Sequence, residues 1–596
     1  MKNITILNLT RMGDLIQSTA LFKKIKLIYP ESRVRLIISK EFEEIAPFLP
    51  YIDEIKPIDV TGLSELLKAN NFEFTTDVVK SLNAIFDGIL NVNYDLAVNL
   101  SHDEFSVYFL YILNSLKNIG ISVNREGIII SNDEMIAYIF SAVKNRKVSV
   151  LNLVDLYERT IDANKTLQHK LHVNKIYLDT KKNNEEHYEN KNGNNEFEVL
   201  KKYGIEESDN IVSFAIGAST ELKKWRYDYF AELAKMFLNG DTKTKVVLLG
   251  ANYDVKAGGF IESIVNNERL INLTGKTSVS DLVYITRRSN LLITHDTGTM
   301  HIGVAVGTKL IVIYTGNVGF LETGPYAENR LLVVPDIGCF PCDFNLKCLN
   351  PVCQGLIKPE YIYDMSLMLL KNEAGYAEKL FKYKNTGIIP YLSRFDSKKF
   401  IDYLPAVKIK LNFKDLKLKI LKLALEHYYE GDFWKIDENE IQLFLDCFEG
   451  IEYNLNLDIE EELKSVEILI ALCKRGISET KKMVNIALTD PFNSKKIDEH
   501  TGNIKSIDFE LKYISSVYDD LSLYNQIHVI SQNSSVSYDL FGLALDSLKN
   551  YSRYKLQLNI FKKVSLIFLD KIKNRHNKNS LLCKEGCQAK PDSGYI

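Results

Sequence analysis

The fold is decided by residues 291–314, LLITHDTGTMHIGVAVGTKLIVIY. The apolar run Leu291–Ile293 is too short for a helix and suits a buried strand, and a second apolar run follows at residues 310–314. The residues between these runs predict a tight turn and a short helix that begins near Thr299. In a doubly wound sheet such a turn lies at the carboxyl ends of the strands, where ligands bind. The sequence therefore predicts an α/β domain with a ligand site at this turn.

Four residues of this turn are candidate ligand-binding residues: Asp296, Thr297, Gly298 and His301. Asp296 and His301 bracket the turn. The free N–H groups at the start of the following helix would face an anion such as a phosphate. Read alone, Asp-Thr-Gly is equally consistent with an ordinary turn that caps a helix.

A second strand-to-helix turn follows the apolar strand at residues 4–9. Gly13 permits a tight turn, and Asp14 lies at the start of a helix predicted for Asp14–Lys26. The Asp14 carboxylate either caps this helix or faces the cleft, and both roles are compatible because a cap fixes the position of the carboxylate.

A third segment repeats the layout after a strand at residues 211–216, with a helix at 229–237 and a strand at 245–250 behind it. Ser219 and Lys223 lie in the loop after the first of these strands, and small hydroxylated residues with a Lys suit a phosphate. The alternative is a surface loop with two solvated lysines. In the first domain, strands are predicted near 4–9, 34–38 and 95–100.

Together these segments resemble glycosyltransferase family 9, the ADP-heptose-dependent heptosyltransferases, over about residues 1–375. The matching motifs are Arg11-x-Gly13-Asp14 with Thr19-Ala20-Leu21, Gly217-Ala218-Ser219 with Lys223-x-Trp225, Asp296-Thr297-Gly298-x-Met300-His301, and Gly324-Pro325-Tyr326. Two positions depart from the family pattern. Arg226 stands where the family usually has Pro, and Asn317 stands where Ser or Thr is commoner.

The resemblance implies a GT-B fold, in which two Rossmann-like α/β domains face a cleft, here followed by an all-α C-terminal extension. Apolar residues at helical spacing after about residue 400 favour helices in that extension. The expected organisation is a first domain at 1–180, a linker at 181–196, a second domain at 197–375, the helical extension at 376–573 and a disordered tail at 574–596.

The resemblance also implies an ADP-heptose donor, bound mainly by the second domain, and inversion at the anomeric carbon. A carboxylate must take the proton of the acceptor hydroxyl. Asp14 is the first choice for this base, and Asp103, which follows the strand at Leu96–Leu100, is the second. Lys223 and the N–H groups around Thr297 would stabilise the departing ADP.

The other candidates divide between the two sides of the cleft. Asp296 is expected to bind sugar hydroxyls, Asp254 a ribose hydroxyl, and His301 the diphosphate or its turn. The remaining residues are Gly13 and Ser219 on the donor side and Arg11 and His102 on the acceptor side. For His102 and Asp103 the alternative is that both are solvated loop residues. No divalent metal is expected in the chemistry, because the motif lacks an acidic pair to hold one.

The acceptor stays open among a lipopolysaccharide core, another glycan and a protein hydroxyl. A transferase that uses another nucleotide sugar is the first alternative. A GT-B binding or scaffold protein whose extension carries the function is the second, and that extension could bind the acceptor or drive homo-oligomerisation. A dinucleotide-dependent oxidoreductase is disfavoured because no G-x-G-x-x-G follows the three key strands.

Four cysteines lie within fifteen residues: Cys339, Cys342, Cys348 and Cys353. Four thiolates suit a tetrahedral zinc or iron ion, and C-x2-C gives the usual chelating pair. A structural metal is therefore expected, with unliganded thiols as the alternative. Two disulfides are disfavoured in a reducing compartment.

Composition indicates an ordinary globular protein of more than one domain. The chain has 596 residues, 46% of them hydrophobic and 25% charged, with a formal net charge of −3. This charge does not indicate nucleic acid as a partner, and no basic cluster is strong enough to suggest a membrane anchor. No apolar run approaches the ~20 residues of a transmembrane helix. Because Met1 leads directly into a strand, no cleavable signal is expected, and a cytoplasmic location is predicted.

Overall fold

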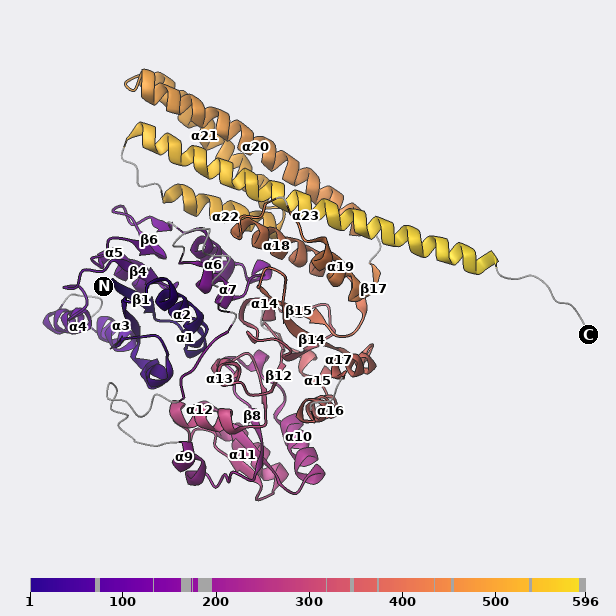
Figure 1. Ribbon diagram of the computed structural model, residues 1–596. Helices are drawn as coiled ribbons and strands as arrows, with labels where there is room; N and C mark the ends of the chain where they lie inside the picture. Colours follow the sequence, from indigo (N-terminus) through magenta and orange to yellow (C-terminus); the bar gives the residue numbers. More distant parts are fainter. Residues whose placement is uncertain are drawn as a thin grey trace, which may run out of the picture. The chain divides into compact units, whose positions relative to one another are not determined.

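The computed structural model forms two compact units, Met1–Val407 and Lys408–Ile596. It describes residues 2–69, 75–131, 133–161, 173, 175–180, 196–317, 319–342, 348–371, 375–433, 435–451, 455–534 and 539–588. Figure 1 shows the elements along the chain, with the first unit in indigo to salmon and the second in orange to yellow.

The first sheet is parallel, with strand order β3-β2-β1-β4-β5. Its strands are β1 (Asn3–Asn8), β2 (Arg33–Ser39), β3 (Glu54–Ile58), β4 (Leu96–Asn99) and β5 (Asn118–Ile119), and the hairpin β6 (Ile121–Val123) and β7 (Ile129–Ser131) lies beside it. The helices of this domain are α1 (Met12–Gln17), α2 (Thr19–Ile28), α3 (Val60–Ala69), α4 (Thr76–Phe86), α5 (Glu104–Ile112), α6 (Glu134–Lys144) and α7 (Leu153–Arg159). The strands predicted near 4–9, 34–38 and 95–100 are confirmed as β1, β2 and β4.

The second sheet has the order β10-β9-β8-β11-β12-β13-β14-β15, and it is parallel from β10 to β13. Its strands are β8 (Asn210–Ala215), β9 (Thr244–Leu249), β10 (Leu270–Asn272), β11 (Leu291–Thr294), β12 (Leu310–Ile313), β13 (Leu331–Pro335), β14 (Ile388–Phe395) and β15 (Ile401–Pro405). Its helices are α9 (Glu196–Lys202), α10 (Tyr227–Gly240), α11 (Val255–Val265), α12 (Val279–Arg288), α13 (Gly298–Val306), α14 (Phe320–Thr323), α15 (Cys353–Leu356), α16 (Pro359–Leu370) and α17 (Tyr376–Lys379).

Both sheets reverse their strand order at a defined point, and this reversal positions the site. In the first sheet β1 lies between β2 and β4, and in the second β8 lies between β9 and β11. Apolar side chains such as Ile6 and Ile293 are fully buried, as expected for strands covered on both faces. Since ligands of open α/β sheets bind outside the carboxyl ends of the strands at the reversal, the residues after β1, β8 and β11 form the expected ligand-binding edge.

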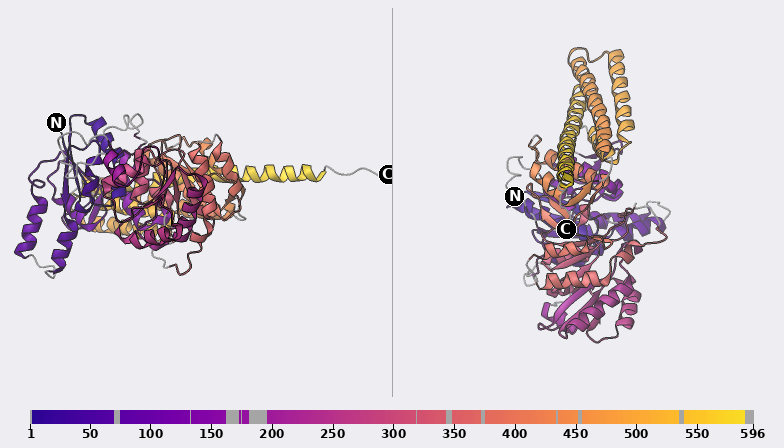
Figure 2. Two further views of the ribbon diagram at one scale, coloured as in Figure 1. Left: turned by 90° about the horizontal axis from the view of Figure 1, so that it is seen from below. Right: turned by 90° about the vertical axis from the view of Figure 1, so that its right-hand side faces the viewer.

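The helical unit contains α18 (Phe413–Tyr429), α19 (Glu438–Asp446), α20 (Leu455–Thr489), α21 (Ser494–Ser515), α22 (Asp519–Asn533) and α23 (Leu540–Gln588), with the short parallel pair β16 (Ile409–Leu411) and β17 (Phe448–Ile451). Long helices α20, α21 and α23 run side by side (Figure 2). Gly476 of α20 makes room for the ring of Tyr551 in α23, because a Cβ at position 476 would lie 2.5 Å from Cε1 of that ring. No helix among the described residues is both long enough and apolar enough to span a bilayer.

These observations confirm two Rossmann-like α/β domains followed by a helical part, and they move two predicted boundaries. The extension was expected from residue 376, but β14 and β15 still belong to the second sheet, and the first unit ends at Val407. The strand β14 pairs antiparallel with β13, so the parallel part of the sheet ends at β13. The helix α23 continues to Gln588, beyond the predicted start of the tail at residue 574. The predicted linker 181–196 lies outside the described residues except for Glu196.

Candidate active site

One cavity of about 830 Å³ lies between the two α/β domains of the first unit. Every residue to which the sequence gave a catalytic, donor-binding or acceptor-side role lines it: Arg11, Gly13, Asp14, His102, Asp103, Ser219, Lys223, Asp254, Asp296, Thr297, Gly298 and His301. The turns after β1, β8 and β11 therefore converge as the strand order predicts.

Asp14 lies on the first-domain wall, at the third position of α1. Its Oδ2 accepts a hydrogen bond from the backbone N–H of Arg11 at 3.3 Å, and its Oδ1 lies 3.4 Å from Nε2 of Gln17. The carboxylate thus satisfies the start of the helix while it remains on the cavity wall. The two roles weighed for Asp14, helix cap and cleft-facing group, are met together.

Asp103 and His102 lie on the same wall, at the start of α5. The Oδ1 atom of Asp103 accepts from the backbone N–H of Ser106 at 2.9 Å, which makes Asp103 the N-cap of this helix. Burial lowers the pKa of His102, and the carboxylates of Asp14 and Asp103 oppose that effect. The ring of His102 is therefore neutral, and its buried Nδ1 has no hydrogen-bond partner among the described residues.

The two domains touch at Gly13 and His301. A Cβ at position 13 would lie 2.8 Å from Cδ2 of His301, and Nε2 of Gln17 lies 3.4 Å from Nε2 of the same ring. Burial lowers the pKa of His301, against the opposing charges of Asp296 and Asp14. The imidazole of His301 is therefore neutral and lies within electrostatic reach of Asp14 from the first domain and Asp296 from the second.

Lys223 and Asp296 face each other on the second-domain wall. Nζ of Lys223 lies 3.7 Å from Oδ2 of Asp296, and these side chains are 8% and 11% exposed. Burial lowers the pKa of Lys223, and Asp296 opposes this. The other oxygen of Asp296 accepts from the hydroxyl of Thr323 at 3.0 Å. A mostly buried cation is thus held beside the start of α13, whose first N–H groups have no partner inside the helix.

The turn that carries Lys223 is fixed by His295, which the sequence did not single out. Burial lowers the pKa of His295 to about 4, so the ring is neutral. Its Nε2 accepts from the backbone N–H of Trp225 at 2.8 Å, and its Nδ1 lies 3.2 Å from the carbonyl of Gly217. One ring therefore joins the end of β11 to both ends of the loop after β8.

Asp254 has hydrogen-bond and ion-pair partners within the protein that the sequence did not indicate. It is 1% exposed, accepts from the backbone N–H of Ala251 at 3.0 Å and pairs with Lys224 at 3.4 Å. A Cβ at Gly217 would lie 2.1 Å from its Oδ2, which explains the glycine. Asp254 still lines the cavity, as does the exposed residue Ser219.

The cavity is also lined by two charged residues that the sequence did not predict, Arg146 and Glu322. Burial raises the pKa of Glu322, and Arg146 opposes this from the first domain. Arg146 comes from the segment between α6 and α7, and Glu322 comes from the short helix α14. The Gly324-Pro325-Tyr326 motif, two residues later, was the only nearby signal.

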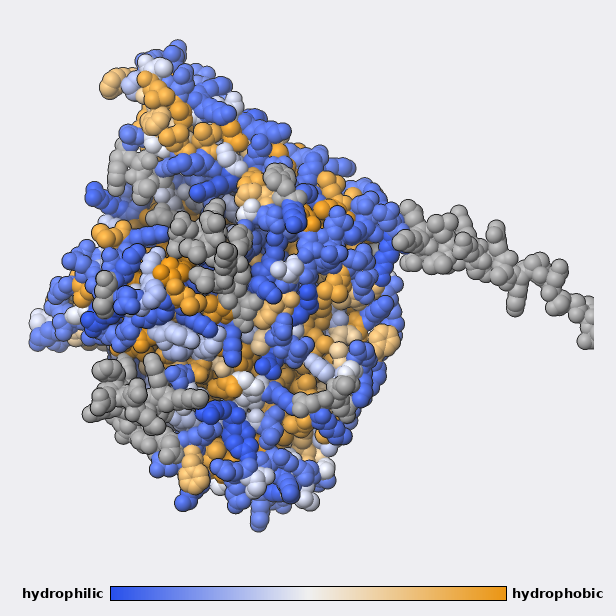
Figure 3. Space-filling view, viewed as in Figure 1, coloured by the Kyte–Doolittle hydropathy of each residue, from blue (hydrophilic) through white to orange (hydrophobic). Residues whose placement is uncertain are grey.

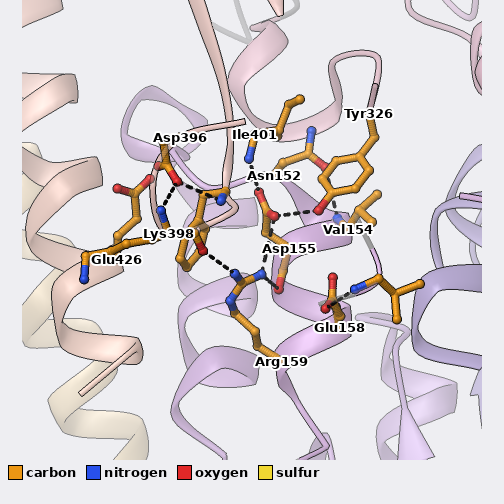
Figure 4. A network of polar contacts seen from close by, with 12 residues as sticks. Asn152, Val154, Asp155, Glu158, Arg159, Tyr326, Asp396, Lys398, Ile401 and Glu426 are labelled. Atoms are coloured by element: carbon orange, nitrogen blue, oxygen red, sulfur yellow. Dashed lines mark hydrogen bonds and ion pairs between the residues drawn. The ribbon is translucent and has the colours of Figure 1, made fainter. Parts of the chain in front are cut away.

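A buried polar network ties α7, which packs on α2 in the first domain, to the second domain (Figure 4). Asp155 accepts from the hydroxyl of Tyr326 at 2.8 Å and from the backbone N–H of Ile401 at 3.1 Å. Arg159 pairs with Asp155 at 3.4 Å, and its guanidinium lies 3.8 Å from the ring centroid of Phe400. Both charged side chains are at most 2% exposed. The Tyr of the Gly-Pro-Tyr motif is therefore part of the connection between the domains.

The cysteine segment packs behind the turn that carries Lys223. The backbone N–H of Cys342 donates to Gly316 at 2.9 Å, and Nε2 of Gln354 donates to the carbonyl of Glu221 at 2.9 Å. Burial raises the pKa of Cys342 and of Cys353, and the effect of neighbouring thiols, Cys339 and Cys348 included, adds to it. Cys342 and Cys353 are thus within electrostatic reach of the other two thiols. Residues 343–347 lie outside the described part, and within that part no three His, Cys, Asp or Glu side chains are grouped to hold a metal.

Comparison with known proteins gives one family match. Residues 83–352 match the model of glycosyltransferase family 9 (heptosyltransferase). Lipooligosaccharide heptosyltransferase 2 of Campylobacter jejuni is 30% identical over 155 residues, which are 25% of this chain and 47% of that protein. The chain therefore spans about half the length of this curated relative.

Two further proteins are less similar in sequence, but the match covers more of their length. Lipooligosaccharide heptosyltransferase 2 of Haemophilus influenzae is 23% identical over 341 residues, or 56% of this chain and 88% of that protein. The crystal structure of a family 9 glycosyl transferase from Veillonella parvula is 20% identical with a TM-score of 0.45, and the match covers 62% of this chain and 98% of that chain.

Proposed function

We propose that this chain, whose residues 83–352 match the model of glycosyltransferase family 9, transfers heptose from ADP-heptose to an acceptor hydroxyl. The observation that carries the proposal is the single cavity in which Asp14 of the first domain faces Lys223, Asp296 and the start of α13 in the second. The cavity volume of about 830 Å³ falls in the range of small-molecule sites. A lipooligosaccharide or lipopolysaccharide is the acceptor that the relatives' names favour, and another glycan or a protein hydroxyl is the alternative.

The donor would bind mainly to the second domain. The diphosphate would accept hydrogen bonds from the N–H groups at the start of α13 and from Lys223, since both are donors next to the cavity. Asp296 would bind sugar hydroxyls, and Asp254, held in place by Lys224, would bind a ribose hydroxyl. Burial lowers the pKa of Lys223, and a bound diphosphate would oppose that effect by supplying a second anion beside Asp296.

The reaction needs a base for the acceptor hydroxyl. As the acceptor oxygen bonds to the anomeric carbon, the bond from that carbon to the ADP oxygen breaks, and a carboxylate takes the hydroxyl proton. Attack from the side opposite to ADP inverts the anomeric centre. Asp14 suits the base, because it lines the cavity and the adjacent Gly13 lies against His301 of the donor-binding domain. Asp103 also lines the cavity, but its Oδ1 is used to cap α5.

The departing ADP carries the negative charge, which Lys223 and the helix N–H groups would stabilise. Neutral His301 would position the turn or donate to the diphosphate. On the acceptor side, Arg11 and His102 would orient the incoming hydroxyl. We assign no step to a metal.

Calorimetry with ADP-heptose and UDP-glucose tests the donor assignment. We expect ADP-heptose to bind more tightly, and both Lys223→Ala and Asp296→Ala to weaken it by roughly 1.5–3 kcal/mol, the value of a hydrogen bond to a charged group. Lys235 is exposed on α10 and does not line the cavity, so Lys235→Ala removes the same charge as a control and should leave binding unchanged. Equal affinity for the two nucleotide sugars would move the function to the alternative of another donor.

We also propose that Cys339, Cys342, Cys348 and Cys353 hold a structural zinc or iron ion. Elemental analysis of the purified protein should find about one equivalent of metal, and Cys342→Ser should lower both that content and the melting temperature. Cys447→Ser, in the helical unit, is the matched control. Metal-free protein whose melting is insensitive to Cys342→Ser would leave the segment as four reduced thiols.

A further inference from the structure

One end of the helical unit exposes large apolar side chains. The turn of residues 490–493 joins α20 to α21, and Phe492 in that turn is 96% exposed. Leu488, in the last turn of α20, is 66% exposed. Isolated exposed apolar residues are common on soluble proteins, whereas a group of them marks a binding surface.

Two more apolar residues lie at this end. A small core joins Met483 and Ile486 of α20 to Ala544 of α23 and includes Leu540 at its edge. The start of α23 is therefore fixed beside the turn, and Phe541 and Leu543, which are 36% and 47% exposed, lie in this segment. Figure 3 shows apolar side chains gathered at this end, at the upper left. We call residues 478–500 and 540–544 the hairpin end.

Cations lie next to these apolar residues. A groove at this end is lined by Lys481, Lys482, Lys496 and His500. Lys482 and Lys496 are 53% and 56% exposed, although each has a carboxylate within 3.5 Å. Over residues 474–505 there are seven Lys and Arg against four Asp and Glu. The sequence did not reveal a basic cluster because these lysines lie on two helices, with acidic residues between them.

The acidic residue Glu479, which contacts two residues of the groove, already accepts several hydrogen bonds. Glu479 accepts from Lys482 at 2.6 Å, contacts Nδ1 of His500 at 2.7 Å and accepts from Asn503 at 3.1 Å. The hydrogen bonds from Lys482 and His500 lower the pKa of Glu479 to about 2, so that its charge is present throughout the physiological range. The lysines of the groove therefore remain exposed to solvent around the partly buried, ionised carboxylate of Glu479.

We propose that the hairpin end docks on an anionic lipid bilayer, with Phe492 and Leu488 in the interfacial layer and the lysines against lipid phosphates. Aromatic and aliphatic side chains flanked by lysines match the two components of such a surface, an apolar interior and a negative face. A second copy of this end would suit the surface less well, because it would bring lysines against lysines. The proposal does not depend on the proposed enzymatic function.

Co-sedimentation of the full chain with vesicles tests it. We expect binding to vesicles that contain phosphatidylglycerol and little binding to pure phosphatidylcholine, with salt weakening the former. Leu488→Ser with Phe492→Ser should lower the partition coefficient about tenfold or more, because two exposed apolar side chains no longer enter the interface. Lys481→Glu with Lys496→Glu should cause a similar loss on phosphatidylglycerol.

The matched control is Phe509→Ser. Phe509 is 72% exposed on α21 but lies outside the hairpin end, so this variant should bind vesicles as the unchanged chain does. All of these side chains are exposed, so circular dichroism should show unchanged helix content. Phe492→Trp adds a direct readout. The tryptophan emission of this variant should shift to the blue when phosphatidylglycerol vesicles are added, and the unsubstituted chain should show a smaller shift.

Two results would overturn the proposal. One is vesicle binding that is insensitive to the hairpin-end substitutions. The other is self-association of the chain without lipid, seen by light scattering, that Leu488→Ser with Phe492→Ser abolishes while vesicle binding persists. The second result would make the hairpin end an interface between copies of this chain.

Discussion

Asp14→Asn should lower turnover by about 10²–10⁴ while the protein keeps its fold and its affinity for ADP-heptose. An Asn side chain can still accept the hydrogen bond that Asp14 receives from Arg11, so the start of α1 is retained. It cannot take a proton at neutral pH. Single-turnover measurement with saturating donor separates this loss from slow product release.

The same substitution at Asp103 is the control for this experiment. Because Oδ1 of Asp103 caps α5, Asp103→Asn keeps the cap and should change turnover little. If Asp14→Asn turns over normally and Asp103→Asn loses the activity, the base is Asp103. If neither variant is impaired, the proposed mechanism is wrong.

Asp155→Asn should destabilise the first unit by about 3–5 kcal/mol, because it leaves the charge of Arg159 buried without its ionised partner. The pair is almost fully buried, and Asp155 also accepts from Tyr326 and Ile401 across the domain boundary. Scanning calorimetry of the full chain measures the loss in the transition of this unit.

The control for this loss is an exposed ion pair in the same unit. Arg226 and Asp228 lie 2.6 Å apart with side chains 48% and 44% exposed. Asp228→Asn should cost no more than about 1 kcal/mol, because solvent screens such pairs. Equal losses for the two variants would show that the buried network does not hold the domains together.

The residues that the sequence located share one physical origin. Asp14, Lys223 and Asp296 each follow a buried strand, and the carboxyl ends of parallel strands meet at one edge of a sheet. Apolar runs reveal such strands without any structure. Convergence of the three turns on one cavity was therefore predictable, although the facing of the two sheets rested on the family resemblance.

The residues that the sequence missed lack such a signal. Glu322 and Arg146 come from one-turn helices that carry no periodic pattern, and only the tertiary fold brings them to the cavity. The pairing of Asp254 with Lys224 joins two loops thirty residues apart. The sequence analysis assigned β14 and β15 to the helical part. These strands follow several helices and pair antiparallel with β13 and with each other, and the local sequence pattern does not reveal which strand they pair with.

The contact between Gly13 and His301 has a thermodynamic consequence. With hydrogen in place of a side chain, the backbone of α1 can lie directly against the imidazole of α13, so position 13 is one of the contacts that limit how closely the domains approach. A ligand that contacts both domains binds only the closed form, and its apparent affinity scales with the fraction of molecules in that form. A methyl group at position 13 would lower this fraction before any ligand arrives. The absence of a side chain at position 13 thus lowers the free-energy cost of bringing the two domains together.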